Sequence, residues 1–222
     1  MFDGSFRAPI ERVVRPVGMA LRRTGMSPDH LTILGVLFAV AAAVAIANGK
    51  LQGGLALVIL AALPDMLDGA LAKASNTASQ RGAFFDSVVD RVTDSILFGG
   101  VAWYFASEKS PHLALLPMAI MGVSSLISYE RAKAESLGLY AKGGLMERAE
   151  RIIVLCAGLL FESLLVPILW IMLVLTVATA IQRFAQVWRQ AEVSSTTQAK
   201  RDVRQVRRMS RQSARASRRQ LS

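Results

Sequence analysis

The sequence has little charge, few aromatic side chains and almost no residues that bind soft metals. Only 19% of the 222 residues are charged and 7% are aromatic, and the chain has one cysteine and two histidines. A single cysteine excludes an intrachain disulfide. What the chain has instead is 53% hydrophobic residues and a formal net charge of +10. This combination is typical of a basic integral membrane protein.

Apolar runs follow one another over most of the chain. Because the hydrocarbon core of a membrane is about 30 Å thick, a helix that crosses it needs roughly 20 apolar residues. We predict an all-α membrane domain over residues 1–192, with an amphipathic surface helix at 5–24 and six transmembrane helices within 29–190. The predicted spans cover about 29–48, 51–73, 82–106, 112–136, 147–163 and 167–188.

The tail, residues 193–222, differs from the rest of the chain. It is rich in serine, glutamine and arginine without a regular apolar stripe, which is typical of disorder. Its arginines should attract anionic lipid head groups. Because the tail has no aromatic residues to stack on bases, we predict no nucleic-acid partner.

Basic residues are distributed unevenly between the predicted loops. They precede the first span, follow the second, flank the loop at 138–144 and fill the tail, whereas the opposite loops hold only Lys50 and Lys109. Basic loops stay in the cytoplasm. We therefore predict a multi-pass protein of the cell membrane, with both termini and the site described next on the cytoplasmic side.

Four aspartates lie at the adjoining ends of the second and third predicted spans. Asp65 and Asp68 are spaced i, i+3, and Asp86 and Asp90 are spaced i, i+4, so each pair shares one face of its helix. Grouped acids in membrane helices normally bind cations, relay protons or line a watered cavity, because desolvation of each charge is costly. Carboxylates with no histidine or cysteine nearby favour Mg²⁺. Asp94, a further i+4 step along, is expected to be a solvated residue at a helix end.

Glycine and lysine accompany these acids. Gly69 and Gly82 remove side chains where the two helices would approach each other or a ligand, so a nucleotide can come close to the backbone. Lys73 lies at the predicted cytoplasmic edge, where its charge can neutralise a phosphate.

Residues 65–90 follow the pattern D-x2-D-G-x2-A-K-x8-G-x3-D-x3-D. It resembles the signature of the CDP-alcohol phosphotransferase family at every spacing, with Lys73 where the family usually has arginine. Residues 28–32, Pro-Asp-His-Leu-Thr, resemble a Pro-Asn-x-x-Thr element that family members carry at the start of the first span. The resemblance implies these nucleotide contacts: Asp29, Thr32, Gly69, Lys73, Ser79 and Gly82.

The same resemblance implies transfer of a phosphatidyl group from CDP-diacylglycerol to an alcohol, with release of CMP, by a homodimer in the membrane. Asp65, Asp68 and Asp86 would hold two divalent ions, Mg²⁺ or alternatively Mn²⁺, on the diphosphate. Asp90 would take the proton from the attacking hydroxyl. The residues alone do not separate a base at Asp90 from a fourth metal ligand.

The acceptor alcohol is expected at the cytoplasmic ends of spans four to six, where cations gather. Several cations in one place suit a doubly charged phosphate, and the arrangement is similar to the actinobacterial phosphatidylinositol phosphate synthases within the family. This similarity implies inositol phosphate as the acceptor, held by Arg131, Lys133, Arg151 and Arg183. Lys142 and Arg148 are expected to be anchors at the head-group level.

Two alternatives stay open at this point. Phosphatidylglycerophosphate synthases of the same family use glycerol 3-phosphate, which is also a phosphate ester. A cation channel or carrier would also place acids in a helical bundle, but it predicts acids at mid-depth and on both sides of the membrane. A lipid-bound scaffold would leave the acidic stretch unexplained.

Overall fold

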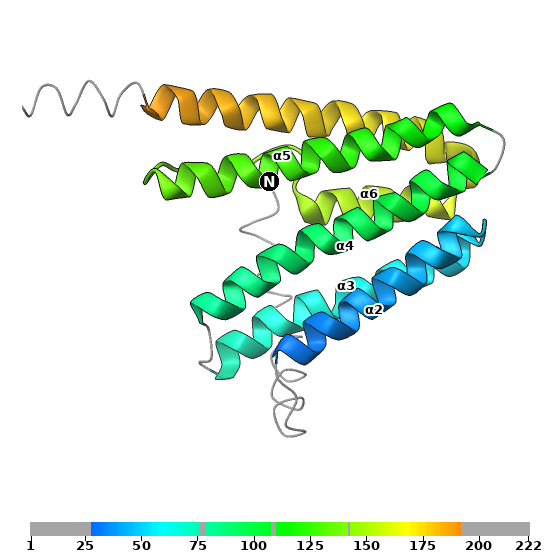
Figure 1. The fold of residues 1–222 in the computed structure, drawn as a ribbon, viewed down its shortest axis with the longest axis horizontal. Helices are drawn as coiled ribbons and strands as arrows, with labels where there is room; N and C mark the ends of the chain where they lie inside the picture. The colour runs from blue at the N-terminus through cyan, green and yellow to red at the C-terminus, as the bar shows by residue number, and fades with distance from the viewer. Residues whose placement is uncertain (1–27, 76–78, 108–109, 142, 192–222) are drawn as a thin grey trace, which may run out of the picture.

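The computed structural model describes residues 28–75, 79–107, 110–141 and 143–191, and these residues contain no β-strand. Of residues 28–29 and 64–75 only the backbone is described. The helices are α2 (Pro28–Ala47), α3 (Leu51–Ser75), α4 (Gln80–Ser107), α5 (Leu115–Ser136), α6 (Arg148–Leu160) and a last helix over 165–191, which we call the 165–191 helix. The short 3₁₀ segments η1 (Pro111–Ala114) and η2 (Glu162–Leu164) precede α5 and the 165–191 helix (Figure 1).

This architecture confirms the all-helical class, and each predicted span corresponds to one of these helices. Within the described residues, three helical segments are long and apolar enough to cross a membrane: His30–Ala47, Pro111–Ser136 and Glu162–Ala191. Among the described residues α3 has a shorter apolar segment, Leu51–Leu63, and α6 has only 13 residues. The predicted amphipathic helix at 5–24 and the tail at 193–222 lie outside the described residues.

Glycine ends two of the helices in the same way. After α2, Gly49 adopts a φ of 74° and donates to the carbonyl of Ile46 at 2.9 Å. After α5, Gly138 adopts a φ of 70° and donates to the carbonyl of Glu135 at 3.0 Å. Since the next residue in each case bonds back to the carbonyl one position earlier, both are Schellman motifs, which need a left-handed residue at this position.

The helices form two groups that meet at one end and diverge at the other (Figure 1). In the first group α2 packs against α3 and α4, and α4 then contacts α5 of the second group. Gly100 of α4 allows the closest approach, because a Cβ there would lie 2.7 Å from the Cα of Ala43. The chain thus brings α2 and α4 into backbone contact where only glycine fits.

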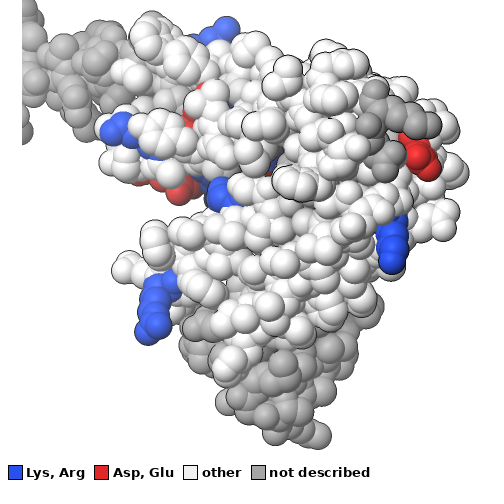
Figure 2. All heavy atoms as spheres, turned by 45° about the vertical axis from the view of Figure 1, so that its right-hand side comes forward, with Lys and Arg blue, Asp and Glu red and all other residues white. Residues whose placement is uncertain are grey.

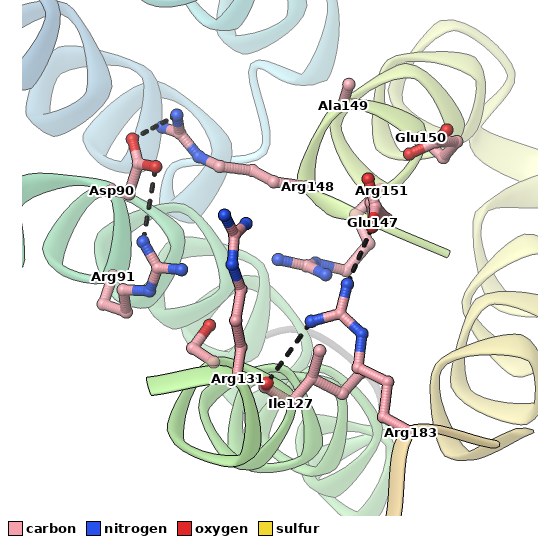
Figure 3. Close-up of a pocket in the computed structure, with 11 residues that line it drawn as sticks. Asp90, Arg91, Ile127, Arg131, Glu147, Arg148, Ala149, Glu150, Arg151 and Arg183 are labelled. Atoms are coloured by element: carbon pink, nitrogen blue, oxygen red, sulfur yellow. Dashed lines mark hydrogen bonds and ion pairs between the residues drawn. The ribbon is translucent and has the colours of Figure 1, made fainter. Parts of the chain in front are cut away.

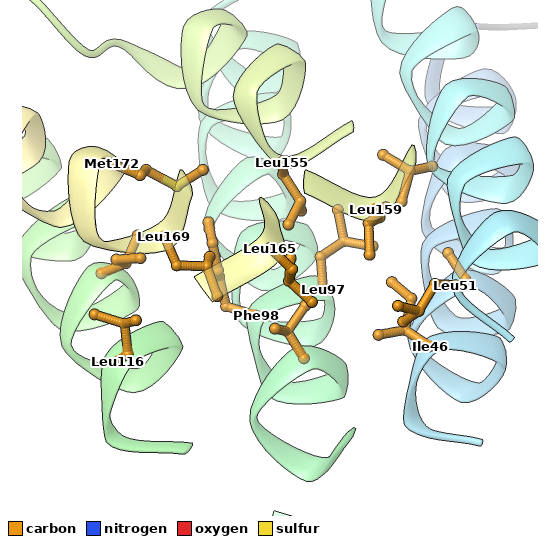
Figure 4. Packing of buried hydrophobic residues seen from close by; sticks show 14 of the residues in the cluster. Ile46, Leu51, Leu97, Phe98, Leu116, Leu155, Leu159, Leu165, Leu169 and Met172 are labelled. Carbon is orange, nitrogen blue, oxygen red and sulfur yellow. The ribbon is translucent and has the colours of Figure 1, made fainter. Parts of the chain in front are cut away.

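The largest buried side chains of the hydrophobic core meet between α4, the end of α6 and the start of the 165–191 helix (Figure 4). It joins Leu97 and Phe98 in the second half of α4 to Leu159 of α6 and to Leu165 and Leu169 of the 165–191 helix, all almost completely buried. Toward the end where α4 begins and α5 ends, apolar residues such as Ile127 and Met146 are still buried, but charged side chains also surround a cavity.

The outer surface is apolar around the middle of the helices. Large side chains such as Leu37, Trp103 and Val174 are more than half exposed. On the face seen in Figure 2, charged side chains lie toward the two ends of the helices and leave an uncharged region between them. An exposed apolar surface of this extent is what contact with lipid requires.

Candidate functional site

A cavity of about 300 Å³ lies between α4, α5, α6 and the 165–191 helix, toward the end where α4 begins and α5 ends. Charged side chains from all four helices turn toward it (Figure 3). The arginines that line it are Arg91, Arg131, Arg148, Arg151 and Arg183, and the acids are Asp90, Glu147 and Glu150. Five arginines against three acids give the cavity wall an excess of positive charge, which favours an anion there.

Asp90 of α4 lies at the edge of the cavity and contacts two arginines. One of its carboxylate oxygens pairs with Arg148 of α6. The other lies 3.3 Å from Nη1 of Arg91, which also donates to the carbonyl of Ser87 at 2.7 Å. The side chain of Asp90 remains 20% exposed, so the carboxylate predicted to act as base or metal ligand is reachable from the cavity.

Asp94 does not lie in solvent, contrary to the sequence-based expectation. The residue is only 7% exposed, and its two carboxylate oxygens accept from Arg151 at 2.8 Å and from Arg148 at 3.3 Å. The step from Asp90 to Asp94 is one helical turn, so both acids face α6. Arg148, expected to anchor at the head-group level, instead bridges the two carboxylates.

Arg183 is buried and tied to three different segments. Its guanidinium donates to Glu147 at 2.7 Å, to the carbonyl of Gly143 at 3.0 Å and to the carbonyl of Ile127 at 3.4 Å. Only 5% of the Arg183 side chain is exposed, and 39% of Glu147. The 165–191 helix is thereby fixed against α5 and against the loop that leads into α6.

Two further contacts hold that loop, residues 137–147, along the 165–191 helix. Tyr140 exchanges two hydrogen bonds with Gln190, at 3.0 and 2.6 Å. The backbone N–H of Met146 donates to the hydroxyl of Thr179 at 3.0 Å. Gly144 is needed beside Thr179, because a Cβ there would lie 2.4 Å from the Thr179 methyl group. The loop therefore sets where α6 begins and where Arg148 points.

The predicted acceptor residues separate into two groups. Arg131, Arg151 and Arg183 all line the cavity, and Arg131 is also 3.0 Å from Glu135 on the same helix. Lys133 lies exposed on α5 and is not part of the cavity wall. Positions 131 and 133 are about 200° apart around a helix, so their side chains point to different sides of α5.

The predicted nucleotide contacts are placed in part. Thr32 of α2 lines a second, small cavity of about 20 Å³ together with Asp90 and Arg148. Ser79 accepts the backbone N–H of Gly82 at 3.0 Å, so its hydroxyl caps the start of α4. The side chains of Asp29 and Lys73, and the surroundings of Gly69, lie outside the described residues.

The metal-ligand prediction can be followed along the backbone. Asp68 lies seven residues before the end of α3 and Asp86 six residues after the start of α4; Asp65 and Asp90 lie ten residues from the same two ends. The short segment 76–79 joins these two helix ends. Counted from it, the pair Asp65 and Asp68 on α3 and the pair Asp86 and Asp90 on α4 therefore lie at similar distances along their helices. Asp86 is half-buried, and the side chains of Asp65 and Asp68 are outside the described part. A donor set made only of carboxylates fits a hard divalent cation.

The sequence-based predictions did not place Arg91, Glu147 or Glu150 in the cavity wall, and they favoured a head-group anchor for Arg148 although its charge also suited the acceptor site. A signal for Arg148 was present, since it stands three residues before Arg151 and so shares a face of α6 with it. Glu147 carries no comparable signal, because its position depends on the fold of the 137–147 loop.

Known proteins resemble this chain over most of its length. The family model described as CDP-alcohol phosphatidyltransferase matches residues 26–182. A phosphatidylinositol phosphate synthase of Mycobacterium marinum is 36% identical over 192 residues, covering 82% of this chain and 82% of that protein. An archaetidylinositol phosphate synthase of Methanothermobacter thermautotrophicus is 36% identical over 190 residues, covering 82% of this chain and 92% of that protein.

Solved structures agree with these relatives. The crystal structure of Mycobacterium tuberculosis phosphatidylinositol phosphate synthase with CDP-DAG bound has a TM-score of 0.74 to this structure at 35% identity, covering 80% of this chain and 94% of that one. The same enzyme in complex with manganese and citrate also has a TM-score of 0.74, at 34% identity, covering 79% of this chain and 88% of that one.

Proposed function

The chain belongs to the CDP-alcohol phosphatidyltransferase family, and we propose that it transfers the phosphatidyl group of CDP-diacylglycerol to inositol phosphate, giving phosphatidylinositol phosphate and CMP. The observation that carries this proposal is the cavity beside Asp90, where five arginines line a space of about 300 Å³. An acceptor with a phosphate ester supplies the dianion that such a cavity suits. The names of the relatives support inositol phosphate as that acceptor.

On the donor side, we propose that Asp65, Asp68 and Asp86 hold two Mg²⁺ ions, with Asp90 as a further ligand. Manganese in a solved relative supports a divalent ion at this site. When bound, the ions stabilise the negative charge on the diphosphate of the donor. The nucleotide would lie along the backbone at Gly69 and Gly82, with Asp29, Thr32, Lys73 and Ser79 around it. Thr32 supports this placement by lying beside Asp90 in the second cavity.

Asp90 is the proposed base. It lines both cavities, so it stands where a donor near Thr32 and an acceptor among the arginines would meet. A base must lie within hydrogen-bond reach of the hydroxyl whose proton it takes. The carboxylate would accept the proton of the attacking hydroxyl while the bond between the two donor phosphates breaks and CMP leaves.

On the acceptor side, we propose that Arg131, Arg151 and Arg183 face the phosphate of inositol phosphate, joined by Arg148. Planar guanidinium groups bind phosphate oxygens in pairs. Cations from α5, α6 and the 165–191 helix surround the cavity (Figure 3), so a phosphate there can be contacted from several sides. Lys133 has no place in this arrangement.

The chain is an integral membrane protein. We propose that α3, α4 and α6 cross the bilayer beside the three long apolar segments, giving six spans, and that the cavity and both termini face the cytoplasm of the cell. The many arginines at the cavity end support this orientation. We also propose a homodimer, for which Gly99 and Gly122 offer open positions on α4 and α5.

The test is CMP release by the detergent-purified protein with CDP-diacylglycerol and Mg²⁺. Inositol phosphate, glycerol 3-phosphate and free inositol are compared as acceptors, and Asp90→Asn is the blank. Release that needs inositol phosphate and is lost in the variant supports the proposal. Preference for glycerol 3-phosphate would replace the acceptor and keep the family chemistry. The proposal would be contradicted if no acceptor supports CMP release, or if Asp90→Asn releases as much CMP as the wild-type protein.

A further inference from the structure

Asp94 holds two arginines of the cavity wall at once. Its Oδ2 atom is 2.8 Å from Nη2 of Arg151, and its Oδ1 atom is 3.3 Å from Nε of Arg148. Both arginines line the cavity, but Asp94 itself does not. Each carboxylate oxygen therefore serves a different cation, from behind the surface that an acceptor would touch.

The buried charges of Asp94 and Arg151 stabilise each other. A buried carboxylate is stable only when it is paired, and Asp94 is 7% exposed. Arg151 is buried as well, at 4%, and also donates to the carbonyl of Met146 at 3.3 Å. Arg148 continues the group by pairing with Asp90. The result is an unbroken series of ion pairs from Asp90 through Arg148 and Asp94 to Arg151.

Such a series has a use beyond joining α4 to α6. A flexible arginine loses conformational freedom when it binds a phosphate, and an arginine that is already fixed loses less. Because Asp94 holds Arg148 by its Nε atom, Nη1 of that guanidinium stays paired with Asp90 at the edge of the cavity. Removing the negative charge at position 94 would leave both arginines without the group that orients them.

We propose that Asp94 is a positioning residue for acceptor binding: it orients Arg148 and Arg151 so that their guanidinium groups face the acceptor's phosphate ester beside Asp90. The inference rests on the proposed function, since it takes the arginine-lined cavity as the acceptor site. It adds a residue that lies outside the aspartate signature and touches neither substrate. Asp94 acts through the arginines alone.

The experiment compares Asp94→Asn with the wild-type protein in CMP release. We expect the KM for inositol phosphate to rise about 10- to 100-fold, the loss that follows when charged hydrogen bonds are disordered, while the KM for CDP-diacylglycerol stays unchanged. Glu162→Gln is the matched control, because it removes one negative charge at the other end of the bundle, where Glu162 accepts from Tyr104 at 3.0 Å. This control should alter neither KM.

A second readout does not depend on turnover. Inositol phosphate should raise the melting temperature of the wild-type protein, because a ligand that binds only the folded state stabilises it. That increase should disappear in Asp94→Asn and persist in Glu162→Gln. If Asp94→Asn lowers the melting temperature but leaves the KM for inositol phosphate and the ligand-induced increase unchanged, Asp94 only joins the helices and the proposal is wrong.

A double-mutant cycle tests whether Asp94 acts through Arg148. The effect of Asp94→Asn on the acceptor KM should shrink when Arg148→Gln is already present, whereas fully additive effects would overturn the proposal. If Asp94→Asn does not fold, Arg151→Lys takes its place, since it keeps the charge and loses the fork that meets Asp94; an unchanged acceptor KM would then count against the proposal. A wild-type protein that releases no CMP with any acceptor contradicts the proposed function instead.

Discussion

Asp90 of α4 is paired with Arg148 of α6. The ion pair joins the residue proposed as base and metal ligand to the wall of the acceptor cavity. A divalent ion at Asp90 must compete with this arginine, because both cations are attracted to the same carboxylate. The Asp90–Arg148 pair should therefore affect both the metal ions on CDP-diacylglycerol and the binding of the acceptor.

Arg148→Gln should lower the concentration of Mn²⁺ that gives half-maximal CMP release by several-fold, because the competing positive charge is removed. The maximal rate should fall as well, since the cavity loses one of its arginines. A titration of CMP release with Mn²⁺ measures both quantities. Arg91→Gln is the comparison: Arg91 lies 3.3 Å from Asp90 and is 41% exposed, so its effect should be smaller. An unchanged or raised Mn²⁺ requirement in Arg148→Gln would refute this competition.

Asp86→Asn should raise the Mg²⁺ requirement at least about tenfold, because an amide is a weaker ligand for a hard cation than a carboxylate. Ser87→Ala, at the exposed neighbouring position, is the control and should leave the requirement unchanged. The same assay with a chelator should show no CMP release until Mg²⁺ or Mn²⁺ is restored. Equal Mg²⁺ curves for the two variants would remove Asp86 from the proposed ligand set.

Arg183→Gln should both destabilise the protein and weaken acceptor binding. Of its three partners the carbonyl of Ile127 is buried, and a buried acceptor left without its donor costs about 1–3 kcal/mol. The melting temperature in detergent and the KM for inositol phosphate measure the two effects. Lys133→Gln removes the same charge from an exposed position outside the cavity wall and should change neither. A raised acceptor KM in Lys133→Gln would restore that residue to the acceptor site.

Gly100→Ala should destabilise the fold by about 1–3 kcal/mol, because the added methyl group meets the backbone of Ala43 and forces α2 and α4 apart. Gly99→Ala is the matched control one position earlier. Its Cβ would meet nothing within 4 Å among the described residues, so it should be neutral or slightly stabilising through helix propensity. Unfolding midpoints in the same detergent compare the two. Equal destabilisation by both variants would indicate that Gly99 is covered in the folded protein, for example by a second copy of the chain.

The sequence by itself determined the helical architecture and the acidic pairs. Apolar runs of bilayer length and the glycines at 49 and 138 mark the helices, because hydrophobic period and helix ends depend on residues close together in the chain. The register of Asp65, Asp68, Asp86 and Asp90 follows from helix geometry alone. So does the separation of Arg131 from Lys133 around α5, although we grouped the two by charge and not by angle.

Only the tertiary structure decided what the charges contact. Nothing near Asp94 in the sequence distinguishes it from a solvated residue, yet it is buried against Arg148 and Arg151 because the fold brings the start of α6 opposite that face of α4. Arg183 lines the cavity because the 137–147 loop folds back along its helix. Ion pairs between distant segments depend on how helices pack, and packing depends on the whole set of side chains, so local sequence patterns do not contain it.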